Sequence, residues 1–278
     1  MSVSVLILTR NEEQNVPDCL ASVKWCDDVV VLDSRSTDRT VAVAKSAGVR
    51  VFERTFDDFA TQRNYALDEI PFQHPWVFHL DADERFTEPL QRECVVVTAE
   101  DRYSGFLVPS KLMFMDKWLR WSGMYPVYQM RLMKLGEIRF IQAGHGQREA
   151  DAKRGVGKMR EPYLHYNFSK GLDDWQEKHD RYSTKEAEES LQERQNGQIG
   201  WGDLGGTDPV ARRRALKRFS MRLPCRPALR FLYMYVLRLG FLDGRPGLAY
   251  CRLLATYERM IVTKLKDLER RRFTSTST

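Results

Sequence analysis

The first hundred residues alternate between short apolar runs and longer segments with helical spacing. The apolar runs are too short for helices and rich in β-branched or aromatic residues: Val3–Leu8, Val29–Leu32, Val49–Phe52 and Trp76–Leu80. The segments between them have helical periodicity: Val16–Lys24, Thr40–Ala47 and Phe59–Ile70. Continuous apolar strands joined by helices indicate a parallel sheet covered on both faces. The sequence therefore predicts an α/β fold that binds ligands at the carboxyl ends of its strands.

The pattern changes after a predicted helix at Thr87–Ala99. Shorter predicted strands follow: Ser104–Pro109, Tyr128–Lys134, Ile138–Ile141 and Tyr163–Tyr166. The aromatic segment Lys111–Tyr125 fits an acceptor-binding wall and ordinary core equally well. A polar helix is predicted at Leu172–Gln195, and helices dominate from there to about Arg272. We expect a catalytic domain at residues 1–195, a basic helical region at 207–272 and a disordered tail at 273–278.

Composition places the chain among ordinary globular proteins, with 42% hydrophobic and 29% charged residues. The five cysteines are odd in number and form no CxxC pair, which argues against a disulfide framework and a structural zinc site. The start has no basic leader, so Met1–Arg10 is interpreted as a first strand. The apolar stretch Phe231–Leu242 contains Arg238 and is shorter than the roughly 20 residues of a membrane span. We expect a cytoplasmic protein.

Positive charge is concentrated near the C-terminus. Residues 210–272 hold 17 Lys and Arg against 4 Asp and Glu, a balance of +13, which leaves −7 elsewhere for a chain of net charge +6. Apolar and aromatic residues lie among these arginines, as in helices that bind anionic lipid. Peripheral attachment to the cytoplasmic face of the inner membrane is therefore expected. Packing of these helices on one another or in a homo-oligomer is nearly as favoured, and nucleic acid is not expected because no nucleic-acid-reading motif is found.

Three polar clusters follow the predicted strands, at Thr9–Glu13, Asp33–Asp38 and Asp81–Glu84. In an extended segment Asp81 and Asp83 point the same way. Two carboxylates at the end of a buried strand are costly unless they are neutralised, and Mg²⁺ or Mn²⁺ with an anionic ligand would do so. The alternative is a solvated acidic turn neutralised by Arg85. Likewise, Asp33 fits both a simple βα turn and a group that accepts hydrogen bonds from a base or ribose.

Four ordered segments together resemble a known family: Val5–Asn15, Val30–Thr40, Gln62–Ala66 and Leu80–Arg85. They are similar to the signatures of family 2 glycosyltransferases with the GT-A fold, and most of all to the bacterial subgroup that adds sugars to lipopolysaccharide cores and surface glycans. This resemblance implies a mostly parallel central sheet with helices on both faces and a C-terminal helical extension.

The resemblance also implies roles for individual residues. Asp83 and His165 are similar to the family's metal ligands. The nucleotide-sugar-binding positions would be Thr9, Arg10, Glu12, Asp33, Arg63, Asn64, Asp81 and Arg131. Glu149 is the expected catalytic base, with Asp116 and His145 as substitutes. The segment Gly144–Glu149 departs from the subgroup's His-Glu pattern by three inserted residues.

The expected activity is inverting, metal-dependent transfer of a hexose from a nucleotide sugar, with a UDP-sugar favoured, to a lipid-linked or surface-glycan acceptor. Two other functions fit part of the pattern. A sugar nucleotidyltransferase would need a glycine-rich phosphate loop after the first strand, and Thr9–Asn15 contains no glycine. An inactive membrane- or polyanion-binding scaffold would explain the basic C-terminus but gives no reason for Asp33, Arg63 and the paired aspartates.

Overall fold

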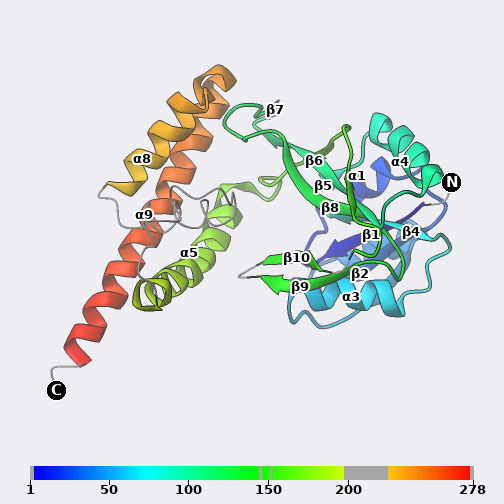
Figure 1. The fold of residues 1–278 in the computed structure, drawn as a ribbon, viewed down its shortest axis with the longest axis horizontal. Coiled ribbons are helices and arrows are strands. Elements are labelled where there is room, and N and C mark those ends of the chain that lie inside the picture. The colour runs from blue at the N-terminus through cyan, green and yellow to red at the C-terminus, as the bar shows by residue number, and fades with distance from the viewer. Residues whose placement is uncertain (1–2, 144–145, 151, 197–224, 276–278) are drawn as a thin grey trace. The chain divides into compact units, whose positions relative to one another are not determined.

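The computed structural model describes residues 3–143, 146–150, 152–196 and 225–275 (Figure 1). The chain divides into two compact units, Met1–Gly171 and Leu172–Thr278. This division lies earlier than the predicted domain boundary at residue 195. The polar helix α5, Gly171–Asn196, therefore groups with the C-terminal helices and not with the sheet.

The first four strands form the parallel half of the central sheet, in the order β3-β2-β1-β4. They are β1 (Val3–Thr9), β2 (Val29–Asp33), β3 (Arg50–Glu53) and β4 (Trp76–Asp81). The helices that connect them are α1 (Val16–Ser22), α2 (Thr40–Ser46) and α3 (Phe59–Glu69). The alternation of strands and helices predicted from the sequence is confirmed.

Both faces of this sheet are buried, since successive residues of a strand enter different cores. Val5 and Ile7 of β1 belong to the core beneath α1, α2 and α4 (Glu88–Glu100), whereas Leu6 joins the core beneath α3. Apolar residues are thus needed at every position of the strand. This explains why β1 is a continuous apolar run in the sequence.

The rest of the sheet is mixed, in the order β4-β8-β6-β12-β5. Its strands are β8 (Val127–Lys134), β6 (Gly105–Phe114), β12 (Tyr163–His165) and β5 (Glu84–Arg85), and β6 also pairs with β7 (Lys117–Trp118) and β11 (Val156–Lys158). Strands β9 (Arg139–Ala143) and β10 (Gly146–Ala150) form a separate hairpin. Because β12 pairs with β5, His165 lies opposite Glu84, beside the paired aspartates.

The second unit consists of helices. After α5 the structure describes α8 (Arg226–Leu232), a π-helical turn at Tyr233–Leu237, a 3₁₀ turn at Gly240–Asp243 and α9 (Gly244–Ser275). Helix α9 extends three residues into the predicted tail 273–278, and the other tail residues lie outside the described part. Within that part, the helices all lack the length of apolar sequence needed to cross a bilayer.

Candidate functional site

Asp81, at the end of β4, lies between two arginines. Arg131 of the neighbouring strand β8 donates from Nη2 to Asp81 Oδ2 at 2.7 Å and also to Glu84 Oε1. Arg63 of α3 approaches Asp81 Oδ1 from Nη2 at 3.4 Å. Arg131 and Glu84 are almost completely buried, whereas Asp81 remains partly accessible. The Asp81 carboxylate is thus partly open to solvent, while the guanidinium groups of Arg63 and Arg131 that pair with it are buried.

These contacts set the ionisation of the cluster. Burial alone would raise the pKa of Asp81, but the charges of Arg131 and Arg63 outweigh it and hold that pKa well below its usual range. Burial raises the pKa of Glu84 to about 7, despite the nearby charge of Arg131. Burial also lowers the pKa of Arg63 to about 10, which leaves it charged at neutral pH. Asp81 is therefore a permanently ionised hydrogen-bond acceptor.

Asp83 has different surroundings. Its Oδ2 lies 3.4 Å from His165 Nε2, and its backbone carbonyl accepts a hydrogen bond from the Tyr166 amide at 2.8 Å. Burial works against protonation of His165, but the charge and hydrogen bond of Asp83 outweigh it and raise the pKa of the imidazole. The sequence resemblance paired these two residues, and the structure brings them into contact across 82 positions of chain.

The Asp83–His165 pair can supply two donors to a cation. Two ligands that lie about 2.1 Å from one ion at roughly a right angle are about 3.0 Å apart, and the observed gap is 3.4 Å. Within the described ranges, no group of three or more His, Cys, Asp or Glu side chains is arranged to hold a metal. An ion here would take its other ligands from water and ligand phosphates, as Mg²⁺ commonly does.

The loops after β1 and β2 are joined around Asp33, which is fully buried. Thr9 lies opposite Asp33 in the strand register and donates from Oγ1 to Asp33 Oδ2 at 2.8 Å. The Ser36 amide donates to Asp33 Oδ1 at 2.7 Å, and Asn11 Oδ1 accepts from the Thr37 amide at 2.8 Å. Asp33 therefore orders both loops, as the βα-turn interpretation expects.

Glu12 connects these loops with a distant residue. Its carboxylate accepts hydrogen bonds from Asn15 Nδ2 at 2.7 Å and from Lys170 Nζ. Burial raises the pKa of Glu12 in spite of both donors, and the charge of Asp83 adds to the increase. Glu12 and Asp83 therefore lie within electrostatic range of each other. Sequence reasoning missed Lys170, which is 158 positions from Glu12 and has no local signal.

The remaining predicted site residues are less closely associated with the cluster. Arg10 is exposed, and the Asn64 amide is engaged with the Phe140 backbone at 2.9 and 3.0 Å, which fastens β9 to α3. Glu149 is exposed on β10, and Asp116 is exposed at the turn between β6 and β7. Among the described contacts, none joins these two carboxylates to Asp81 or Asp83. The third base candidate, His145, lies outside the described residues.

Two buried residues of the cluster were not predicted from the sequence. Glu84 accepts from Arg131 and also, through Oε2, from the Asp81 amide at 2.9 Å. His79 Nδ1 lies 3.3 Å from Arg63 Nη1, and burial followed by the charge of Arg63 holds the pKa of His79 well below its usual range. The sequence signal for Glu84 is that Asp81, Asp83 and Glu84 place three carboxylates within four residues. Burying negative charges this close together is unfavourable unless a cationic side chain lies among them.

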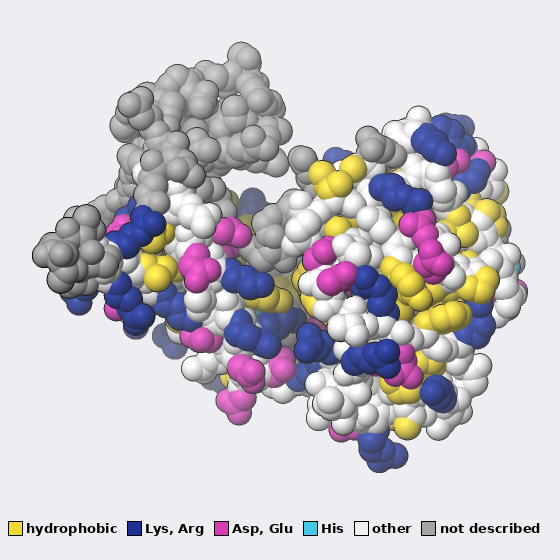
Figure 2. Space-filling view, turned by 90° about the horizontal axis from the view of Figure 1, so that it is seen from below, with side chains coloured by type: hydrophobic (Ala, Val, Ile, Leu, Met, Phe, Trp, Pro, Cys, Tyr) yellow, Lys and Arg dark blue, Asp and Glu magenta, His cyan; other side chains and the backbone are white. Residues whose placement is uncertain are grey.

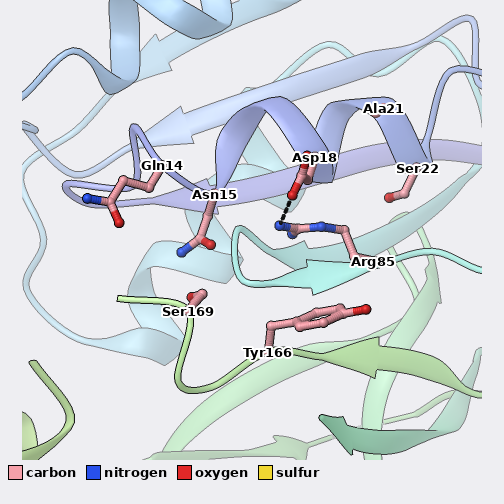
Figure 3. Close-up of a pocket in the computed structure, with 8 residues that line it drawn as sticks. All are labelled: Gln14, Asn15, Asp18, Ala21, Ser22, Arg85, Tyr166 and Ser169. Atoms are coloured by element: carbon pink, nitrogen blue, oxygen red, sulfur yellow. Dashed lines mark hydrogen bonds and ion pairs between the residues drawn. The ribbon is translucent and has the colours of Figure 1, made fainter. Parts of the chain in front are cut away.

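A cavity of about 490 Å³ is lined in part by Tyr166, the residue whose backbone amide donates to the Asp83 carbonyl (Figure 3). Its lining comes from α1 and the two residues before it, from Arg85 and from the loop after β12: Gln14, Asn15, Asp18, Ala21, Ser22, Arg85, Tyr166 and Ser169. The Arg85 guanidinium lies over the Tyr166 ring, 5.5 Å from its centroid, and contacts Asp18 Oδ2 at 3.4 Å. Amide, hydroxyl and guanidinium groups around an aromatic ring suit a hydroxyl-rich ligand.

Comparison with known proteins identifies a matching family. The family described as Glycosyl transferase family 2 matches residues 4–148. The lipopolysaccharide core biosynthesis glycosyltransferase LpsC of Rhizobium meliloti is 27% identical over 199 residues, 69% of this chain and 73% of that protein. An uncharacterized glycosyltransferase of Rickettsia bellii is 34% identical over 119 residues, 41% of this chain and only 39% of its own length. The crystal structure of S. aureus TarS 1–349 is 15% identical, with a TM-score of 0.45 over 97% of this chain and 92% of that one.

Proposed function

The chain belongs to glycosyl transferase family 2, and we propose that it transfers a hexose from a nucleotide sugar, most favourably a UDP-sugar, to a lipid-linked or surface-glycan acceptor. The family match confirms the resemblance predicted from the four sequence motifs. The name of LpsC supports an acceptor of the lipopolysaccharide-core class. No described contact argues for the nucleotidyltransferase interpretation.

The observation that carries the proposal is the pair of unlike aspartates at one sheet edge. Asp81 is held ionised by Arg63 and Arg131, so it accepts hydrogen bonds from ribose hydroxyls without taking up a proton. Asp83 and His165 are proposed to hold Mg²⁺ or Mn²⁺, since their donor atoms are spaced for one ion. Such an ion offsets the negative charge that develops on the departing nucleoside diphosphate.

The transfer step follows from general chemistry. A carboxylate removes the proton from the acceptor hydroxyl, and the oxygen attacks the anomeric carbon while the bond to the diphosphate breaks. A single in-line displacement inverts the anomeric centre. Glu149 is the proposed base, with Asp116 and His145 as substitutes. Solvent exposure leaves Glu149 free to meet an acceptor that arrives from outside.

The cavity lined in part by Tyr166 is proposed to receive a sugar ring of the acceptor. Its polar lining is suited to hydroxyl groups, and the Tyr166 amide connects it directly to the Asp83 carbonyl. Replacing Gln14, an exposed residue of this lining, by Ala is expected to raise the acceptor KM and leave donor hydrolysis unchanged. An unchanged acceptor KM would exclude this assignment.

A cytoplasmic location on the inner face of the inner membrane is proposed from charge. Described residues 225–275 contain 11 Lys and Arg against 4 Asp and Glu. A basic surface is attracted to anionic lipid, near which a lipid-linked acceptor would lie. A homo-oligomer formed by these helices is the alternative, and no nucleic acid is proposed.

The proposal is tested by thermal stabilisation with UDP and UDP-sugars, each with and without Mn²⁺, and by hydrolysis of the donor. Asp83→Asn is expected to abolish the Mn²⁺-dependent part of both signals. Asp27→Asn serves as a matched control, because Asp27 is an exposed carboxylate paired with His74 on another part of the sheet domain. The proposal fails if no nucleotide sugar stabilises the protein or if hydrolysis is the same in EDTA. Absence of all turnover would favour the inactive scaffold.

A further inference from the structure

The outer surface of residues 229–242 is unusually apolar. Eight of the large exposed hydrophobic side chains lie within these fourteen residues: Leu229, Leu232, Tyr233, Val236, Leu237, Leu239, Phe241 and Leu242. We call this set the apolar face. Leu237 is 74% exposed, the highest value among the exposed large hydrophobic residues of the described chain. Contiguous apolar surface of this kind marks a site of interaction with a partner or a membrane.

The spacing of the apolar face is that of a helix side. Leu229, Leu232, Tyr233, Val236 and Leu237 follow the i, i+3, i+4, i+7, i+8 pattern that normally faces a protein core. Here that side faces outward, while Met234 on the other side is completely buried. Helix α8 and the π-helical turn after it therefore form an amphipathic segment whose apolar side stays exposed among the residues that the structure describes.

These side chains cannot turn inward, because the inner side is already filled. Met234 and Asp243 are both buried there. Helix α9 packs so closely on the 3₁₀ turn that a Cβ added to Gly247 would lie 2.3 Å from the carbonyl oxygen of Gly240. The exposed position of the apolar face is thus fixed by the packing beneath it.

The charges around this face are of one sign. Residues 226–246 contain four arginines and one acid, the buried Asp243. Arg226 is paired with Glu258 at 2.8 Å, but among the described residues no ion pair involves Arg230, Arg238 or Arg245. These three cations lie beside the apolar face in the chain, and none of them has a described ion pair.

Some basic side chains elsewhere in the same unit have acidic partners. Lys264 pairs with Asp180 at 2.7 Å, and Arg194 pairs with Glu269 at 2.6 Å. In the face shown in Figure 2, basic and acidic side chains are interspersed over the described surface. Around the apolar face, three arginines without a described ion pair lie beside exposed leucines in the chain.

We propose that the apolar face inserts into the headgroup region of an anionic lipid bilayer, with Arg230, Arg238 and Arg245 bound to lipid phosphates. Shallow insertion of apolar and aromatic side chains with arginine at the interface is the arrangement used by monotopic proteins. A second copy of the chain fits less well, because a two-fold contact would bring the same arginines together without a carboxylate to pair them. The inference deepens the proposed function, on which it rests for the lipid-linked nature of the acceptor.

Vesicle flotation of the full chain tests this assignment. The vesicles contain phosphatidylcholine alone or phosphatidylcholine with about one third phosphatidylglycerol. We expect binding to the anionic vesicles, a loss of about tenfold or more for Leu237→Ser with Leu242→Ser, and about fivefold for each of Arg238→Gln and Arg245→Gln. Val96→Ser and Arg102→Gln are matched controls, since both residues are exposed in the sheet unit, and they should bind normally.

Unchanged flotation of the leucine variant would overturn the proposal. So would a concentration-dependent dimer that these same substitutions dissociate, because the apolar face would then cover a second copy. Donor hydrolysis is measured in parallel. Lost flotation with normal hydrolysis is the expected result for the variants, whereas missing hydrolysis in the unaltered protein would refute the proposed transferase function without affecting the lipid-binding result.

Discussion

Arg131 is the buried cation on which the candidate site depends, and its replacement by Met gives a sharp prediction. Methionine keeps most of the length of the side chain and removes the charge. The Asp81 carboxylate would lose its shortest described cationic contact, at 2.7 Å, and Glu84 would lose its described cationic contact. The packing of the guanidinium on the Tyr163 ring, at 5.2 Å from the centroid, would also be lost.

The expected cost is large because both acids stay buried or half-buried. Removing one member of a buried ion pair typically costs about 3–5 kcal/mol of unfolding free energy. For a chain of this size each kcal/mol lowers the melting temperature by roughly 2–4 °C, so we expect a fall of roughly 6–20 °C at pH 7.5. Arg92→Met is the matched control. Arg92 pairs with Glu88 on an exposed helix face, where such pairs contribute about 0.5 kcal/mol or less.

The defect should depend on pH in a defined direction. Burial raises the pKa of Glu84 to about 7 and the charge of Arg131 lowers it, so the pKa rises further in Arg131→Met. An acid whose pKa is higher in the folded state loses stability as the pH rises above its unfolded value of about 4.3. The variant should therefore be closer to the unaltered protein at pH 5.5 than at pH 8.

Calorimetry across pH 5.5–8 measures both effects. The double variant Arg131→Met/Glu84→Gln should recover part of the loss at pH 8, because it removes one of the two uncompensated acids. The reasoning is refuted if Arg131→Met melts within about 1 °C of Arg92→Met, or if its deficit is larger at the acid end of the range.

Three further predictions concern stability. Burial opposes ionisation of Asp28, but hydrogen bonds from a hydroxyl, a backbone amide and a guanidinium outweigh it and lower the pKa of this carboxyl. The contribution of Asp28 to folding stability is therefore present at neutral pH and is lost as the pH falls below about 4. Asp28→Asn should cost about 2–3 kcal/mol of unfolding free energy at pH 7 and make stability depend less on pH in acid. Gly105→Ala places a Cβ 2.5 Å from Ile138 Cδ1 and should cost about 1–3 kcal/mol by urea unfolding. Asn64→Ala should lower the unfolding free energy by about 2 kcal/mol and speed hydrogen exchange of the Phe140 amide, with little change in UDP affinity. A large loss of UDP affinity at unchanged stability would instead support the predicted binding role of Asn64.

The sequence predicted the parallel half of the fold because the signals there are local. Helix α3 starts at Asp58, whose side chain accepts from the Thr61 amide, and α4 starts at Thr87, which accepts from the Leu90 amide. Such caps and short apolar runs can be recognised within a few residues. The predicted ends of the first four strands consequently agree with the structure to within one residue.

Contacts between residues that are distant in the sequence could not be predicted from such local signals. The hydrogen bond from Lys170 to Glu12 depends on the path of the chain after β12, and no local pattern in either segment indicates it. The engagement of Asn64 with the Phe140 backbone similarly depends on where the β9–β10 hairpin packs. Motif spacing identifies which residues offer polar groups to a site. The hydrogen-bond partners of those groups depend on the topology of the fold.

Asp81 and Asp83 are chemically unlike, and this difference bears on where a cation can bind. Asp81 already faces the positive charges of Arg63 and Arg131, which hold it ionised and would repel a divalent ion from its side. Asp83 lies beside the imidazole of His165, and Glu12 adds negative charge within range. Since an imidazole can give up its proton to become a ligand while a guanidinium cannot, the electrostatics favour a cation at Asp83 and leave Asp81 to accept hydrogen bonds from neutral hydroxyls.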